Sequence, residues 1–144
     1  MIIGVDFDGT CVTHDFPNVG KEIGAVEILR KLVGNGHQII LFTMRSNKLV
    51  KWETNIDDTG NYVPTDRNTL QDAVDWFYSH RIPLYGINEN PTQRAWTNSP
   101  KPYCHYYIDD SAIGCPLTFN DDISNRPYVD WKGVEAFLIM KEVL

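Results

Sequence analysis

The 144-residue chain has few cysteines, fewer cationic than acidic residues, and no long hydrophobic run. Its three cysteines form no CxxC pair, so neither a disulfide framework nor a zinc site is indicated. Lys and Arg number 13 against 19 Asp and Glu, and the net charge of −6 disfavours a nucleic-acid partner. No apolar stretch has the length of a membrane span and no leader pattern follows Met1. We therefore expect a cytoplasmic protein with no membrane partner.

Strand and helix patterns alternate along the chain. Short apolar runs rich in β-branched residues predict buried strands, and apolar residues at helical spacing predict helices. The predicted strands are 2–5, 37–42, 85–87 and 106–108, and the predicted helices are 23–33, 69–80 and 131–143. This alternation is typical of βαβ units. We expect one α/β domain over residues 1–144, with a three-layer α/β/α, Rossmann-like parallel sheet.

The segment 47–66 is longer than most connections between such elements. It would form a hairpin with a turn at 58–60, an irregular flap over a site, or a tolerated surface insertion. The sequence leaves these alternatives open.

The first predicted strand stops at a pair of acidic residues, in the run Asp6-Phe7-Asp8-Gly9-Thr10. Open parallel sheets bind ligands at the carboxyl ends of their strands. Because side chains alternate along an extended chain, Asp6 and Asp8 would point the same way. Two carboxylates in one small volume require a cation between them or a retained proton. The alternative is a capped strand end with an Asx turn.

Other strand ends also carry polar residues. Thr43 follows the strand 37–42, Asp109 and Asp110 follow the strand 106–108, and Lys101 lies in the loop before that strand. Carboxylates and a backbone carbonyl are the hard oxygen ligands that Mg²⁺ prefers. A hydroxyl and an ammonium group suit the oxygens of a phosphoryl group. The set indicates phosphoryl transfer.

In their order along the chain, these residues resemble the motifs of the haloacid-dehalogenase-like (HAD) phosphohydrolase superfamily. The resemblance covers about residues 1–115, and the chain is most similar to small members with little or no cap. It implies a HAD-like core and a Mg²⁺-dependent phosphomonoester phosphatase that forms an aspartyl-phosphate on a small-molecule phosphorylated substrate. Because 47–66 is at most a small flap insertion, it also implies an open site, which a homo-oligomer could close.

The resemblance further implies a role for each motif residue. Asp6 would be the nucleophile and Asp8 the acid and base. The implied Mg²⁺ ligands are Asp6, the backbone carbonyl of Asp8, Asp109, and Asp110 directly or through water. The implied phosphate-binding residues are Gly9, Thr43, Met44 and Lys101. Arg45 and His14 lie where substrate selection would be expected.

Several of these residues have an alternative interpretation. Thr43 would simply cap the following turn, and Asp110 would be a solvated carboxylate. Arg45 would pair with an acidic loop instead of selecting a substrate. Arg94 and Arg45 also compete with Lys101 for the phosphate.

Other chemistry and other functions use the same residue types. Cys11 lies close to the acidic pair and could serve as a nucleophile. A receiver-like phospho-acceptor domain also contains an acidic pair, an acceptor Asp, a Thr and a Lys, but it places the acidic pair first, whereas here the would-be acceptor Asp6 leads. A non-catalytic phosphate-binding regulatory domain is the remaining alternative.

Overall fold

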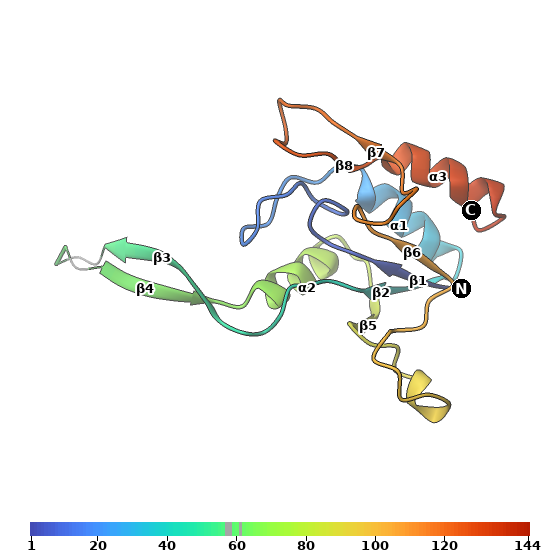
Figure 1. Cartoon of the computed structure of the whole chain (residues 1–144), viewed down its shortest axis with the longest axis horizontal. Coiled ribbons are helices and arrows are strands. Elements are labelled where there is room, and N and C mark those ends of the chain that lie inside the picture. Colours follow the sequence, from blue (N-terminus) through green and yellow to red (C-terminus); the bar gives the residue numbers. More distant parts are fainter. Residues whose placement is uncertain (57–58, 61) are drawn as a thin grey trace.

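A four-stranded parallel sheet forms the centre of the molecule (Figure 1). The computed structural model describes residues 1–56, 59–60 and 62–144, with the backbone alone for 50–56 and 62–65. The strands, in their spatial order, are β5 (Leu84–Ile87), β2 (Gln38–Leu41), β1 (Ile2–Val5) and β6 (Tyr106–Ile108). The predicted α/β fold with a parallel sheet is confirmed.

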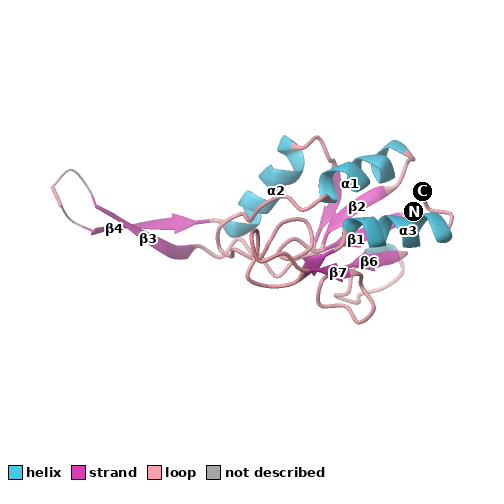
Figure 2. Cartoon of the chain, turned by 90° about the horizontal axis from the view of Figure 1, so that it is seen from above, coloured by secondary structure: helices cyan, strands magenta, loops and turns pink. Residues whose placement is uncertain are grey.

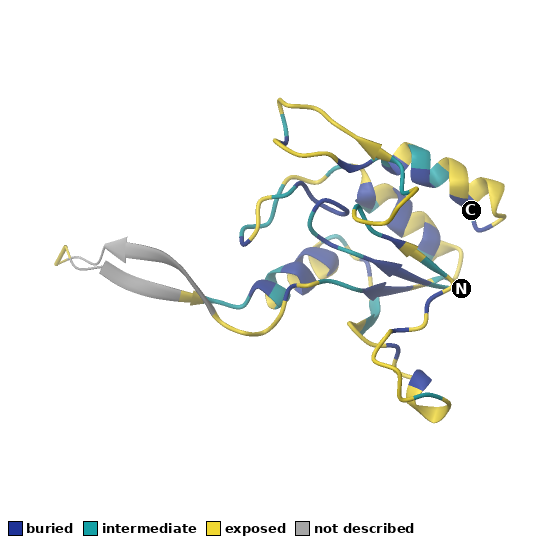
Figure 3. Ribbon diagram, in the orientation of Figure 1, coloured by how far each residue is buried: buried dark blue, intermediate teal, exposed yellow. Residues whose placement is uncertain are grey.

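The main apolar core lies between one face of this sheet and the helices α1 (Ala25–Gly34), α2 (Thr69–Ser79) and α3 (Trp131–Met140). Side chains alternate along a strand, so every second strand residue points to this face. These buried strand residues pack with helix residues in one cluster that includes Ile3, Val5, Ile39, Leu41, Ile108, Leu29, Phe77 and Leu138. In Figure 3 the central strands and the inner sides of the helices are accordingly dark blue.

On the opposite face of the sheet, the last residues of the segment 88–105 contact β1 and β6. The same segment includes a short 3-10 helix, η1 (Gln93–Ala95). A Cβ atom on Gly4 would lie 2.9 Å from the Sγ atom of Cys104, so the glycine lets this segment approach β1 closely. The hydroxyl of Tyr107 in β6 donates to the carbonyl of Pro102 at 2.5 Å. The three-layer arrangement is not confirmed, because an irregular segment occupies the face where a second layer of helices was expected.

Segment 47–66 contains most of a hairpin, formed by β3 (Val50–Ile56) and β4 (Tyr62–Arg67). These strands pair only with each other within the described residues, and they extend away from the sheet (Figures 1 and 2). The hairpin alternative is therefore confirmed, although part of the predicted turn at 58–60 lies outside the described residues.

A second antiparallel pair, β7 (Leu117–Thr118) with β8 (Tyr128–Val129), was not predicted from the sequence. Its strands are too short to show an alternating pattern. The N–H of Val129 donates to the carbonyl of Gly9, so this pair adjoins the loop that follows β1. It thereby links the C-terminal part of the chain to the acidic motif.

The helices α2 and α3 begin at side chains that cap them. The Asn68 side chain accepts a hydrogen bond from the N–H of Gln71 at the start of α2, and Asp130 accepts from the N–H of Lys132 at the start of α3. Among the described residues, no helix is both long enough and apolar enough to cross a lipid bilayer.

Candidate active site at the carboxyl edge of the sheet

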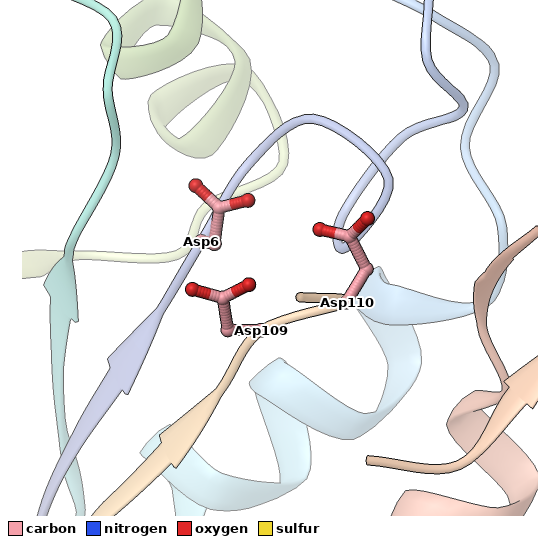
Figure 4. A group of neighbouring side chains, drawn as sticks. All are labelled: Asp6, Asp109 and Asp110. Carbon is pink, nitrogen blue, oxygen red and sulfur yellow. The ribbon is translucent and has the colours of Figure 1, made fainter. Parts of the chain in front are cut away.

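Three of the predicted acidic residues meet where β1 and β6 end (Figure 4). Val5 pairs with Ile108 in the parallel register, so the residues that follow them, Asp6 and Asp109, are neighbours. The N–H of Asp6 donates to the carbonyl of Ile108 at 3.0 Å and extends the strand pairing to this point. Asp6, Asp109 and Asp110 each offer a carboxylate oxygen, and these oxygens lie within 4.8 Å of one another.

The electrostatic environment of Asp6 differs from that of a surface carboxylate. Burial is the largest cause and raises its pKa, a hydrogen bond from the backbone of Phe7 lowers it, and the charges of Asp109, Asp110 and Asp8 raise it further. The resulting pKa is about 7, against the ordinary value of 3.8. A cation among these oxygens would offset the repulsion between them. The half-buried set of hard oxygen donors therefore fits Mg²⁺, which takes few protein ligands.

The Asp8 side chain does not join this group. Its two oxygens accept hydrogen bonds from Arg45, Oδ2 from Nε and Oδ1 from Nη2, each at 2.7 Å. This arrangement is compatible with the expectation that only the backbone carbonyl of Asp8 would reach a metal. The Asp8 carboxylate is therefore separate from the three carboxylates of the candidate metal site. A residue that exchanges protons as acid and base needs this separation.

Arg45 is almost completely buried, with 2% of its surface exposed. A side chain that selects substrate must reach the open part of a site, and this one turns inward to Asp8. Of the predicted roles for Arg45, pairing with an acidic group is the one that the structure contains, although the partner, Asp8, belongs to the acidic motif itself.

His14 also turns toward the acidic residues. Its Nε2 atom lies 3.0 Å from Oδ2 of Asp110, and the backbone N–H of Asp110 donates to the hydroxyl of Thr10 at 3.1 Å. Gly9 makes this contact possible, because a Cβ atom at this position would fall on the His14 ring and 2.8 Å from Oδ2 of Asp110. Asp110 is thus held from two sides and is not a freely solvated carboxylate.

The phosphate-binding residues expected near Thr43 lie at the adjacent strand end. The N–H of Thr43 donates to the Asn88 side chain at 2.8 Å, and its hydroxyl accepts from the N–H of Arg45 at 3.2 Å. The Met44 side chain is 97% exposed.

The fourth residue expected to bind phosphate, Gly9, lies in the loop after β1. Its N–H already donates to the carbonyl of Val12 at 2.7 Å, so in this conformation it is not free for a phosphate.

Asn88 is a residue of this edge that the sequence reasoning missed. Asn88 is the first residue after β5, and Thr43 is the second residue after the neighbouring strand β2. The φ angle of Asn88 is positive, at 52°. A polar residue directly after a predicted strand was the signal that could have identified it.

Lys101 lies against the face of β6 from which Tyr107 projects. Its Nζ atom is 5.1 Å from the centre of the Tyr107 ring, and Asp109 follows this strand at its carboxyl end. Within the described part of the chain Lys101 forms no ion pair, whereas Arg94 is paired with Glu89 at 3.6 Å and Arg45 with Asp8. Among the three predicted phosphate-binding cations, Lys101 is therefore the one still available.

Cys11 does not have the environment of a nucleophile. It is fully buried, and its Sγ atom donates to the backbone carbonyl of Asp6 at 3.3 Å. Burial, and after it the charges of Asp6 and two other carboxylates, raise the pKa of the thiol well above its usual value. A buried thiol that keeps its proton is a packing group.

The chain is similar over nearly its whole length to a solved structure, that of a conserved protein from Bacteroides thetaiotaomicron. The two have 27% sequence identity and a TM-score of 0.66, and the match covers 99% of this chain and 91% of the other. No family model and no curated protein matches the chain. The likeness supports the α/β fold described above for the chain as a whole.

Proposed function

We propose that this chain is a Mg²⁺-dependent phosphatase of the HAD superfamily, which hydrolyses phosphomonoesters of small molecules. The observation that carries the proposal is the meeting of Asp6, Asp109 and Asp110 at the carboxyl edge of the sheet, within 4.8 Å of one another. These carboxylate oxygens would bind a divalent cation, and one of them, on Asp6, would serve as the nucleophile. The raised pKa of Asp6 is further support, because a bound cation would stabilise the ionised carboxylate, which burial and the nearby negative charges disfavour.

In the proposed reaction, an Asp6 oxygen attacks the phosphorus atom of the ester. The bond from this oxygen to phosphorus forms as the bond to the leaving oxygen breaks, and Asp8 supplies the proton that the leaving alkoxide takes up. Asp8 then accepts a proton from water, whose oxygen attacks the phosphorus of the aspartyl-phosphate. This second step releases inorganic phosphate and restores the Asp6 carboxylate.

The remaining residues of the edge would bind and orient the phosphoryl group. Thr43 would donate its hydroxyl to a phosphoryl oxygen, and Lys101 would offset the negative charge. The three carboxylates and the Asp8 carbonyl would hold Mg²⁺, which when bound supplies positive charge at the phosphoryl oxygens.

The proposed phosphatase would have a HAD-like core with little or no cap. This agrees with the hairpin β3–β4, which extends away from the sheet instead of folding back over its carboxyl edge (Figure 1). The site would then be open to solvent, and a homo-oligomer could close it.

Hydrolysis of 4-nitrophenyl phosphate, with Mg²⁺ and with a chelator, tests the proposal. We expect activity that depends on Mg²⁺ and falls by at least about a thousandfold in Asp6→Asn, because the amide cannot act as the nucleophile. Asp75→Asn is the matched control, since Asp75 is exposed on α2 and, among the residues that the structure describes, accepts a hydrogen bond from Gln71 alone. Activity that survives Asp6→Asn would disprove the aspartyl-phosphate mechanism.

The same assay separates the alternatives. A phosphate-binding domain without turnover would bind inorganic phosphate in a calorimeter and release no product from any phosphate ester. A phospho-acceptor domain would take up phosphate from a small donor such as acetyl phosphate and keep it on Asp6 for minutes or longer. Rapid loss of the label together with continuous phosphate release is the result expected of a phosphatase.

A further inference from the structure

The planar guanidinium of Arg45 fixes the orientation of the Asp8 carboxylate. Both Asp8 oxygens accept from it, through Nε and Nη2, each at 2.7 Å. A fork of this kind restricts rotation of the carboxylate about its own axis, which a single hydrogen bond would not do. Each oxygen keeps a further lone pair with which it can exchange a proton with another group.

The guanidinium is itself held in place from several directions. Nη1 donates to the carbonyls of Pro17 and Thr69 at 3.2 Å each, and Nη2 also donates to the carbonyl of Asn18 at 2.6 Å. The rings of Phe7 and Phe16 lie 4.9 and 5.2 Å from its central carbon. These contacts restrict the motion of the Arg45 side chain. The position of the guanidinium therefore determines the position of the Asp8 carboxylate that is bound to it.

Arg45 also connects Asp8 to the residue expected to bind phosphate. Its backbone N–H donates to the hydroxyl oxygen of Thr43 at 3.2 Å. Arg45 would thus determine the distance between the Asp8 carboxylate and the phosphoryl group. Precise positioning of reacting groups can increase the rate of a reaction by several orders of magnitude.

We propose that Arg45 is a positioning residue for the reaction, and that it holds Asp8 where the proton of the leaving group is exchanged. This proposal rests on the proposed phosphatase function. It assigns Arg45 a role other than those expected from the sequence, which were substrate selection, pairing with an acidic loop, and phosphate binding in place of Lys101. Arg45 acts through the Asp8 side chain: its guanidinium donates to that carboxylate and to the backbone carbonyls of Pro17, Asn18 and Thr69, and to none of the three carboxylates of the candidate metal site.

The alternative is that Arg45 only anchors the loop 16–18. Another arginine provides the matched comparison, because Arg67 anchors the same loop without contacting Asp8. Arg67 Nη1 donates to the Asn18 side chain at 3.2 Å, and its Nε donates to Asp72 at 2.6 Å. If Arg45 had a structural role alone, its variant, like the Arg67 variant, would change the rates for different substrates by the same factor.

The test compares two substrates that differ in their need for an acid. The leaving group of glycerol 2-phosphate is an alkoxide, which must be protonated, whereas 4-nitrophenolate leaves without a proton. The value of kcat/KM reports the first irreversible step, in which the leaving group departs. We expect Arg45→Met to lower kcat/KM for glycerol 2-phosphate by about a hundredfold and for 4-nitrophenyl phosphate by less than about tenfold. Arg67→Met should leave the ratio of the two values unchanged.

Two further variants guard against a loss of folding. Arg45→Lys keeps the charge but not the fork, so it should show the same selective loss. In a protein that already carries Asp8→Asn, adding Arg45→Met should cause no further loss with glycerol 2-phosphate, because there is no acid left to position. Circular dichroism would verify that each variant is folded.

The possible failures are distinguishable. If the parent protein hydrolyses neither substrate, the proposed function fails and the inference falls with it. If the parent is active but the Arg45 variants lose both activities by the same factor, or lose neither, the positioning role alone is disproved. A full additional loss in the Asp8→Asn background would have the same meaning.

Discussion

At the scale of single residues, the ionised form of Asp6 destabilises the folded metal-free protein. Burial, with the nearby carboxylates, raises its pKa from 3.8 to about 7, whereas the unfolded chain keeps the ordinary value. Below pH 3.8 the group is protonated in both states and contributes nothing. As the pH rises toward 7, the unfolded chain releases the proton first, so the free energy of unfolding falls.

Asp6→Asn should therefore stabilise the protein in the presence of a chelator. At pH 8 we expect the free energy of unfolding to rise by about 2 kcal/mol, because the amide carries no charge, and at about pH 4 the difference should vanish. Urea unfolding at the two pH values measures this. Asp75→Asn, on the exposed face of α2, should show no such gain. A parent protein that is more stable than Asp6→Asn at pH 8 would contradict the prediction.

Gly9 offers a second prediction at this scale. It has a φ of +79°, and a Cβ atom there would fall on the His14 ring. Gly9→Ala should displace His14 from Asp110 and lower the Mg²⁺ affinity by about tenfold, as measured by calorimetry. Gly36→Ala is the control, because Gly36 has a similar φ of +81° with open space around it. Both variants carry the backbone strain, of about 1 kcal/mol, but only Gly9→Ala should weaken binding. Equal affinities in the two variants would exclude a role for the His14 contact.

At the scale of elements, the sequence predicted what depends on local pattern. The main strands and helices were predicted because their apolar periodicity is clear, and the meeting of Asp6 with Asp109 follows from adjacent parallel strand ends. The covering of the second sheet face was not predicted, since strands that are apolar on both faces do not reveal whether a helix or an irregular segment buries them. The inward turn of Arg45 depends on the path of the loop 16–18, for which no periodic signal exists.

The hairpin β3–β4 should be dispensable for folding. Its strands form a sheet of their own, and Lys51 is directly paired with Asp66. Replacing residues 52–65 by Asn-Gly would close the hairpin early with a favourable two-residue turn. We expect a single cooperative urea transition and a kcat/KM for 4-nitrophenyl phosphate within about threefold of the parent value. An otherwise stable but inactive variant would show that the hairpin contributes to the site.

At the scale of the whole molecule, the candidate metal site joins distant parts of the chain. Asp6 follows the first strand, whereas Asp109 and Asp110 follow β6, near the C-terminal third of the sequence. These carboxylates come together only in the folded state, so an ion bound among them stabilises the fold and not the unfolded chain. Metal binding and global stability should therefore be linked, whether or not the chain turns over a phosphate ester.

This linkage gives the last prediction. At a free Mg²⁺ concentration about a hundred times the dissociation constant, the free energy of unfolding should rise by about 2.7 kcal/mol. Thermal or urea unfolding measures the rise, with NaCl at matched ionic strength to separate it from charge screening. Asp109→Asn should lose most of it, because the group loses one of its three carboxylates, and Asp75→Asn should keep it. If NaCl stabilises the parent as much as Mg²⁺ does, the three carboxylates are a repulsive cluster and not a binding site, and the raised pKa of Asp6 would then reflect burial and the nearby negative charges alone.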